Sequence, residues 1–365
     1  MFDLYGKIKS ILPVSSRSFH SFERRMLDQA AEFSVLRQEN QELRQLLLRV
    51  LDEHSYEQER DMMLYWHLAK NVDRSHPASS EEAKLNFFRG LSRPRGTEKL
   101  FQDNLVKLLC DFDSLCRDCG ISYFAGSGTL LGAYLYNDII PWDDDVDVFV
   151  FRNDISRICQ VAKVGGVFRV TERWDRRCAC RQIRFRLSDY DNPAFIDLFP
   201  LDLIDCDSPH SAWKEYLDVR DDFISNFFKL VDDPSFPDDS WPYVDASSAA
   251  GQMIESVYQS TLNGYGPEVS FVDDLTCANA LLRGIDNINE SRSTGPWPLN
   301  DWLPTIDMHM REFDVMVPCG WRTYLDRHYG DFFIIPKDMH GHQHVKSSSM
   351  NSQAALKSMD GYLRE

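Results

Sequence analysis

Four aspartates stand within five positions of the sequence, between Asp143 and Asp147. Like charges at this spacing repel one another, so the group is costly unless cations neutralise it. In an extended chain Asp145 and Asp147 point to one side, and Val146 to the other. Converging carboxylates are hard oxygen ligands, which suit Mg²⁺ or Mn²⁺ bridged to substrate phosphates. The alternative, a solvated acidic loop or an adventitious calcium site, is disfavoured because loops rarely alternate acids with valines.

A metal site of this kind needs a third carboxylate. Asp197 lies between Ile196 and Leu198, so it interrupts a hydrophobic stretch that is typical of a buried strand. An adjacent strand would place it beside the first two acids. Asp202 is a weaker candidate, because it follows Pro200 and is expected to leave the strand.

A Gly-Ser-Gly turn, Gly126–Gly128, stands between an expected strand and a short helix. The free N–H groups at the start of a helix can receive a phosphate. Taken alone the signal is weak, because many strand-to-helix turns contain glycine for steric reasons.

Two arginines approach the third acid in the sequence. Arg184 and Arg186 share one face if "QIRFRL" is extended. They either bind the phosphate of a leaving nucleotide or balance the acidic cluster. Near the C-terminus, His340, His342 and His344 form a run that we interpret as a loop lining the site rather than a zinc site, because no cysteine accompanies them at metal-finger spacing.

The elements that must position these residues mix helix and strand in one α+β domain. The periodicity predicts a helix over 98–118, a strand over 121–126, a helix over 129–136 and a strand over 145–150. Further strands are expected over 182–187 and 194–204. Residues 208–305 are predicted to be mainly helical.

The first 84 residues have a different pattern. Residues 1–20 form an amphipathic segment, either a contact with an anionic membrane or a frayed terminus. Residues 21–60 carry heptads with Asn40 at an a position, which predicts a parallel homodimer through residues 22–54. The alternative is one helix that folds back on its own catalytic domain. A linker over 61–84, a catalytic domain over 85–345 and a tail over 346–365 complete the expected organisation.

The composition excludes some classes of protein. A net charge of −17 argues against a nucleic-acid partner. Nine cysteines without a regular framework favour a reducing compartment over a disulfide scaffold. No run approaches about 18 uninterrupted apolar residues. We therefore expect a cytoplasmic protein, with peripheral contact at the inner face of the cell membrane.

The longest motif is "LCRDCGISYFAGSGTLLGAYLYNDIIPWDDDVDVFV", which resembles the signature of the LicD family of cholinephosphotransferases and fukutin-related transferases. "FIDLFPLD" and the segment Arg311–Pro336 resemble two later blocks of that family, so the resemblance covers about residues 95–345. It implies a polymerase β-like nucleotidyltransferase core with mainly helical insertions. Its implied site residues are the metal ligands Asp145, Asp147 and Asp197, the phosphate turn Gly126, Ser127, Gly128 and Thr129, and Trp142 as part of the wall.

The resemblance also implies an activity. A phospho-alcohol, phosphocholine or a polyol phosphate, would pass from a CDP-linked donor to a hydroxyl of a cell-surface glycan such as lipopolysaccharide or teichoic acid, with release of CMP. Two departures bear on the transferred group: Ser127 replaces a usual glycine, and Leu135 and Tyr136 replace a usual Arg-His pair. The alternatives are a nucleotidyltransferase that releases pyrophosphate, and a non-catalytic coiled-coil scaffold with a degenerate transferase domain.

Overall fold

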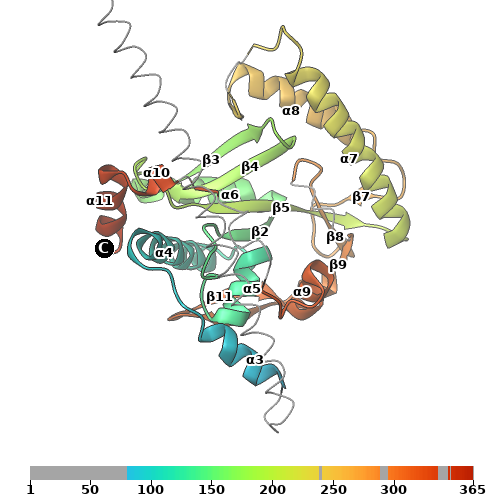
Figure 1. Cartoon of the computed structure of the whole chain (residues 1–365). Coiled ribbons are helices and arrows are strands. Elements are labelled where there is room, and N and C mark those ends of the chain that lie inside the picture. The colour runs from blue at the N-terminus through green and yellow to red at the C-terminus, as the bar shows by residue number, and fades with distance from the viewer. Residues whose placement is uncertain (1–79, 238–240, 288–294, 336–343, 346, 365) are drawn as a thin grey trace, which may run out of the picture. The chain divides into compact units, whose positions relative to one another are not determined.

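A mixed β-sheet forms the centre of the protein in a computed structural model (Figure 1). The structure describes residues 80–237, 241–287, 295–335, 344–345 and 347–364, all within the unit Ala69–Glu365. The expected amphipathic segment and coiled coil, and nearly all of the linker, lie outside the described residues.

The strand order in the main path of the sheet is β1-β2-β5-β4-β3-β6. Strands β2 and β5 run parallel, and the other neighbours along this path are antiparallel. The bounds of these strands are β1 Tyr123–Ala125, β2 Asp147–Phe151, β3 Phe168–Asp175, β4 Cys180–Leu187, β5 Ile196–Asp205 and β6 Tyr243–Asp245. Short strands extend the far end of β5, namely β7 Ser270–Phe271, β8 Ala280–Arg283 and β9 Trp297–Pro298, while β10 Thr305–Met310 and β11 Phe313–Pro318 form a separate hairpin.

Helices pack around this sheet. Their bounds are α3 Ser80–Arg89, α4 Gly96–Asp118, α5 Ser127–Tyr136, α6 Arg152–Ala162, α7 Pro209–Val231, α8 Ala249–Leu262, α9 Trp321–Tyr329, α10 Ser347–Met350 and α11 Gln353–Tyr362. Two 3₁₀ turns cover Val164–Gly166 and Leu299–Asp301.

Helices α7 and α8 lie side by side over a buried cluster that contains Trp174 and Phe223 (Figure 1). None of the helices in the described ranges combines the length and the apolar character that a bilayer span requires.

The β3–β4 hairpin has one apolar and one polar face. Alternate residues of β4, such as Ile183 and Phe185, are buried, and Phe185 packs against Phe112 of α4 with ring centroids 5.1 Å apart. The residues between them, Arg184 and Arg186, are half-buried. This alternation is what a sheet with one covered face produces. The polar face is the one that carries Asp197, because Arg184 and Asp197 are directly paired.

The predicted α+β character and the elements over 98–118, 121–126, 129–136, 145–150, 182–187 and 194–204 are confirmed, within a few residues at their ends. The prediction that 208–305 is mainly helical is wrong beyond Leu262, since β7, β8 and β9 follow. Strand β8 is buried along its whole length, so its sequence shows no alternation by which to recognise it.

The expectation that Asp202 leaves the strand is also wrong. Strand β5 continues through Pro200 to Asp205, and Asp202 pairs with Leu282 of β8. Pro200 has no N–H to donate to a neighbouring strand, but its carbonyl still accepts a hydrogen bond of 3.0 Å from Asn287 Nδ2.

The last twenty residues, expected as a tail, contain α10 and α11. Asn104 of α4 donates through Nδ2 to the carbonyl of Met359, at 3.2 Å, so α11 is fixed against α4. This contact fixes the C-terminal helix to the unit that contains Asp145, Asp147 and Asp197.

Gly132 lets α5 approach the following loop closely. A Cβ atom there would lie 2.6 Å from the Asp138 carbonyl oxygen and 3.1 Å from the Ile140 nitrogen. Since backbone cannot move as a side-chain tip does, we expect Gly132→Ala to lower the free energy of unfolding by about 1–3 kcal/mol, measured by urea denaturation. Gly361→Ala, in α11 with nothing within 4 Å of the new Cβ, is the matched control and should stabilise by about 0.5–1 kcal/mol. Equal urea midpoints for the two variants would contradict this packing.

Candidate active site

Three aspartates converge where strands β2 and β5 begin. Asp147 opens β2, Asp197 is the second residue of β5, and the two are direct neighbours in the parallel register. Asp145 lies two residues before Asp147. Each of the three offers a carboxylate oxygen within 4.8 Å of the others. The structure therefore brings together the three acids that the sequence singles out, as an acidic group able to bind a metal ion.

Backbone hydrogen bonds hold this arrangement in place. The Asp197 nitrogen donates to the carbonyl of Val146 at 2.8 Å, which joins the two acid-bearing segments. The Asp147 nitrogen donates to Thr129 Oγ1 at 2.8 Å, so the first turn of α5 supports the start of β2. Thr129, predicted to bind substrate, is buried and has a structural contact here.

The Gly126–Gly128 turn passes close to the acids. A Cβ atom on Gly128 would lie 2.6 Å from Asp143 Oδ2, and one on Gly126 would lie 2.2 Å from the ring of Phe149. Ser127 has φ +43°, an uncommon value outside glycine, and its nitrogen donates to the Tyr324 hydroxyl at 3.2 Å. Tyr324 thus supports the strained turn from α9. The positive end of the α5 dipole lies beside the carboxylates, where it favours negative charge.

The crowding of the acids shifts their pKa values. Burial, and then the charges of Asp147 and Asp144, raise the pKa of Asp143 to about 6, although a hydrogen bond with Asp145 opposes the shift. Burial and the neighbouring Asp143 raise the pKa of Asp145 well above its usual range. These shifts express repulsion in the metal-free protein, which a cation would relieve.

His344 reaches this cluster from the C-terminal region. Its Nδ1 lies 3.1 Å from Asp144 Oδ1 and 3.1 Å from Asp145 Oδ2. Its backbone nitrogen and that of Val345 donate to Asp144 Oδ2, at 2.9 and 2.8 Å. A hydrogen bond with Asp144, followed by the charge of Asp145, raises the pKa of His344 to about 9 despite its burial. The interpretation of this run as a site-lining loop fits His344, while His340 and His342 lie outside the described residues.

Arg184 forms a bidentate ion pair with the third acid. Its Nε and Nη2 lie 2.8 and 3.2 Å from the two oxygens of Asp197, and its guanidinium stacks 3.8 Å from the centroid of the Phe195 ring. Of the two interpretations, this geometry favours charge balance for Arg184. Arg186 differs: its Nε is buried and has no hydrogen-bond partner within the described part of the chain.

The aromatic residues before the acids form a wall. Trp142 is half-buried and packs edge-to-face on Tyr136, with ring centroids 6.0 Å apart. Tyr136 itself is 3% exposed and also packs edge-to-face on Phe88. Tyr136 is therefore a core residue, and Trp142 is the member of the pair that is exposed enough to contact a ligand.

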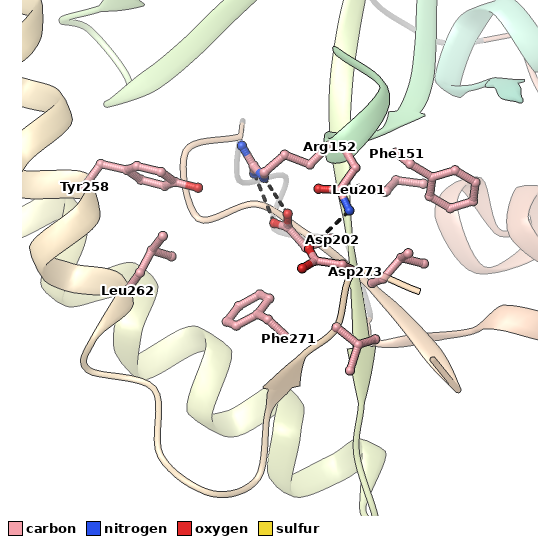
Figure 2. Close-up of a pocket in the computed structure, with 11 residues that line it drawn as sticks. Phe151, Arg152, Leu201, Asp202, Tyr258, Leu262, Phe271 and Asp273 are labelled. Carbon is pink, nitrogen blue, oxygen red and sulfur yellow. Dashed lines mark hydrogen bonds and ion pairs between the residues drawn. The ribbon is translucent and has the colours of Figure 1, made fainter. Parts of the chain in front are cut away.

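A separate cavity of about 180 Å³ lies at the other ends of β2 and β5 (Figure 2). Its labelled lining residues in Figure 2 are Phe151, Arg152, Leu201, Asp202, Tyr258, Leu262, Phe271 and Asp273. Arg152 is already neutralised, by Asp202 with an Nη2–Oδ2 distance of 3.0 Å and by Asp286 at 2.8 Å. This cavity lacks the converging acids, so the candidate active site is at the opposite ends of the strands.

Comparison with known proteins identifies the domain that holds the acids. Residues 120–231 match the family described as LicD/FKTN/FKRP, nucleotidyltransferase domain. These residues belong to that family. The match begins just before β1, includes the turn and all three acids, and ends with α7.

Three curated relatives show the extent of the similarity. Over 56 residues the chain is 43% identical to the lipopolysaccharide cholinephosphotransferase LicD of Haemophilus influenzae, covering 15% of this chain and 21% of that protein. Over 86 residues it is 36% identical to the ribitol 5-phosphate transferase FKRP of Mus musculus, covering 22% and 17%. The human FKRP gives the same identity and coverage. The chain spans about a fifth of the length of these relatives.

Metal binding by the three acids can be tested directly. Titration of the full chain with Mn²⁺ should show binding, and Asp147→Asn should weaken it at least about tenfold, because even residues that only support metal ligands contribute 10–100-fold. Asp207→Asn, at an exposed position after β5, is the control and should bind as the wild type does. Unchanged affinity in the Asp147 variant would exclude it as a ligand.

The raised pKa of Asp143 gives a pH dependence in the metal-free protein. A native pKa of about 6 against 3.8 in the reference state means that the native state binds the proton more tightly, so stability falls as pH rises from about 4 to 6. Asp143→Asn removes this loss. In EDTA, the difference in unfolding free energy between Asp143→Asn and the wild type should therefore shift in favour of the variant from pH 4 to pH 7, by at most about 3 kcal/mol. A difference that does not change with pH would contradict the raised pKa.

Proposed function

We propose that this protein transfers a phospho-alcohol from a CDP-linked donor to a hydroxyl group of a glycan, with release of CMP. The observation that carries the proposal is the convergence of Asp145, Asp147 and Asp197 beside a glycine turn, within a domain of the LicD/FKTN/FKRP family. The two kinds of named relative, a cholinephosphotransferase and a ribitol 5-phosphate transferase, support a phosphate-linked alcohol as the transferred group.

The acids fit a divalent cation such as Mg²⁺ or Mn²⁺. All three donors are carboxylate oxygens, which these ions prefer, and the raised pKa of Asp145 shows a repulsion that a cation would remove. Asp145, Asp147 and Asp197 would hold the metal. Bound there, it would supply charge neutralisation for a diphosphate and acidify an acceptor hydroxyl.

Residues of the chain itself would bind the substrates and move the proton. The turn at Gly126, Ser127 and Gly128 presents the start of α5, whose dipole favours a phosphate. Asp197 is the nearest candidate for a general base, and the bidentate bond from Arg184 fixes the orientation of its carboxylate. Arg186 is the cation available to a substrate anion, while Arg184 would become available only on leaving Asp197. Trp142 would cover the entrance beside the acids.

The same acids would serve a nucleotidyltransferase that releases pyrophosphate. The two reactions differ in the phosphorus atom that is attacked and so in the product that leaves. A non-catalytic scaffold remains the alternative from another class, and the retention of all three converging acids weighs against it.

The deciding experiment measures CMP and pyrophosphate after incubation of the full chain with Mg²⁺ and CDP-choline, CDP-ribitol or CDP-glycerol, each with lipopolysaccharide or teichoic acid as acceptor. We expect CMP release that EDTA abolishes. Asp145→Asn should reduce the rate by about 10²–10³-fold, the usual cost of losing one strong electrostatic contribution to the transition state. Asp207→Asn should retain the wild-type rate.

Other outcomes would each redirect the assignment. Pyrophosphate release from nucleoside triphosphates, without CMP release from the CDP donors, would assign nucleotidyl transfer instead. Near-wild-type turnover of Asp145→Asn at saturating Mg²⁺ would contradict the role given to the three acids.

A further inference from the structure

Two arginines face each other across neighbouring strands on the polar side of the sheet. Arg169 of β3 and Arg186 of β4 are direct partners in the antiparallel register. Like charges in this position destabilise a sheet. The protein has a net charge of −17, so carboxylates are plentiful, and a pair of arginines left without one calls for a specific explanation.

On the same face, Arg184 is balanced by an ion pair with Asp197. Arg173 stands opposite Asp245 of β6 in the strand register, without an ion pair to it. Arg169 donates to the Leu187 carbonyl at 3.0 Å and stacks 3.8 Å from the centroid of the exposed Tyr190 ring. Neither Arg169 nor Arg186 has an ion pair with any carboxylate of the described residues.

Burial and the neighbouring arginines both disfavour the charged form of Arg186, which nevertheless stays protonated at neutral pH. Burial, and then the nearby Arg184, Arg169 and Arg173, lower the pKa of Arg186 to about 10. Together with the buried Nε that lacks a partner, this indicates a place where an anion would be stabilised.

The pair lies close to the acids and on a defined side of them. Asp147, Asp197 and Arg184 form a row across β2, β5 and β4. Arg186 is two residues further along β4, which corresponds to about 7 Å. The glycine turn follows β1, so in the strand order β1-β2-β5-β4-β3 the turn and the arginine pair lie on opposite sides of the acids.

Phosphoryl transfer requires the acceptor and the leaving nucleotide to lie on opposite sides of the phosphorus atom. The attacking and leaving oxygens are roughly in line through phosphorus, so the acceptor approaches from the side away from the leaving nucleotide. If the turn side takes the diphosphate of the donor, the arginine side takes the acceptor.

We propose that Arg169 and Arg186 form a binding site for an anionic group of the acceptor, a phosphate or a carboxylate on the sugar next to the reacting hydroxyl. Tyr190 would line this site, because Arg169 stacks on its ring. The inference rests on the proposed function and deepens it: the acceptor is an acidic glycan rather than a neutral one.

Binding can be measured without catalysis. Isothermal titration of the full chain in EDTA would use glucose 6-phosphate, glucuronate and glucose as probes. We expect the charged sugars to bind and glucose not to bind, and the stronger of the two charged probes identifies phosphate or carboxylate as the preferred group. Arg169→Gln and Arg186→Gln should each weaken that binding at least about tenfold, because each removes a charge-assisted hydrogen bond. Arg89→Gln, an exposed arginine of α3, is the matched control and should bind as wild type.

The outcomes separate this proposal from the enzymatic one. If the CMP-release assay fails, the sugar titration still tests the acceptor site. If the sugars do not bind, the CMP-release assay still tests the proposed transfer from the CDP-linked donor. No binding to wild type, or unchanged binding in both arginine variants, would overturn the acceptor site. Displacement of the sugar by CMP would also overturn it, since the pair would then serve the donor. Arg169→Gln and Arg186→Gln each remove one of two like charges that repel each other across the strands. Neither substitution should lower the melting temperature of the protein, so weaker sugar binding by a variant would not reflect unfolding.

Discussion

The repulsion among carboxylates at the start of β2 and β5 is the constraint on which the rest of the site depends. The parallel register makes Asp147 and Asp197 direct neighbours, and hydrogen bonds between the two segments prevent them from separating. A fold that needed only stability would place apolar residues there, as it does one position later with Val148 and Leu198. The sheet therefore keeps a locally unfavourable arrangement that a cation would make favourable.

The protein limits this cost in three different ways. Arg184 neutralises Asp197 through a bidentate pair. The backbone and imidazole of His344 neutralise Asp144. Burial holds the pKa of Asp143 at about 6, so this carboxyl can retain a proton near neutral pH more readily than an exposed one. Of these, Arg184 and His344 contact metal-binding candidates directly, so the same contacts that stabilise the metal-free protein would have to adjust around a bound ion.

The sequence could predict those parts of the site that follow from local pattern. Alternation of acids with valines or leucines identified Asp145, Asp147 and Asp197, because a strand fixes side-chain direction over two residues. The sequence predicts that the histidine run lines the site, but not which acids His344 contacts, and it does not predict the contact of Tyr324 with the turn, since each contact joins segments about 200 residues apart that local periodicity does not relate. The place of Asp202 does not follow from Pro200, because the strand continues past the proline and pairs with β8, a long-range contact that local sequence does not show. The Arg169–Arg186 pairing depends on hairpin register, which is set by the turn that joins the strands.

Other arginines, away from the three converging acids, are paired with carboxylates. Arg181 is largely buried and Arg152 lines the cavity of Figure 2, and Asp286, Asp202 and Glu172 form ion pairs with them. Burying a guanidinium without such partners is costly, yet pairing inside the protein is incomplete: the buried Arg220 and Arg283 have guanidinium nitrogens without a hydrogen-bond partner in the described part of the chain. Arg169 and Arg186 stand on the polar face of the sheet and are left without a carboxylate. What distinguishes Arg169 and Arg186 is their position: they are direct cross-strand partners of like charge, close to the three converging acids, where an anionic group of a substrate would supply the missing negative charge.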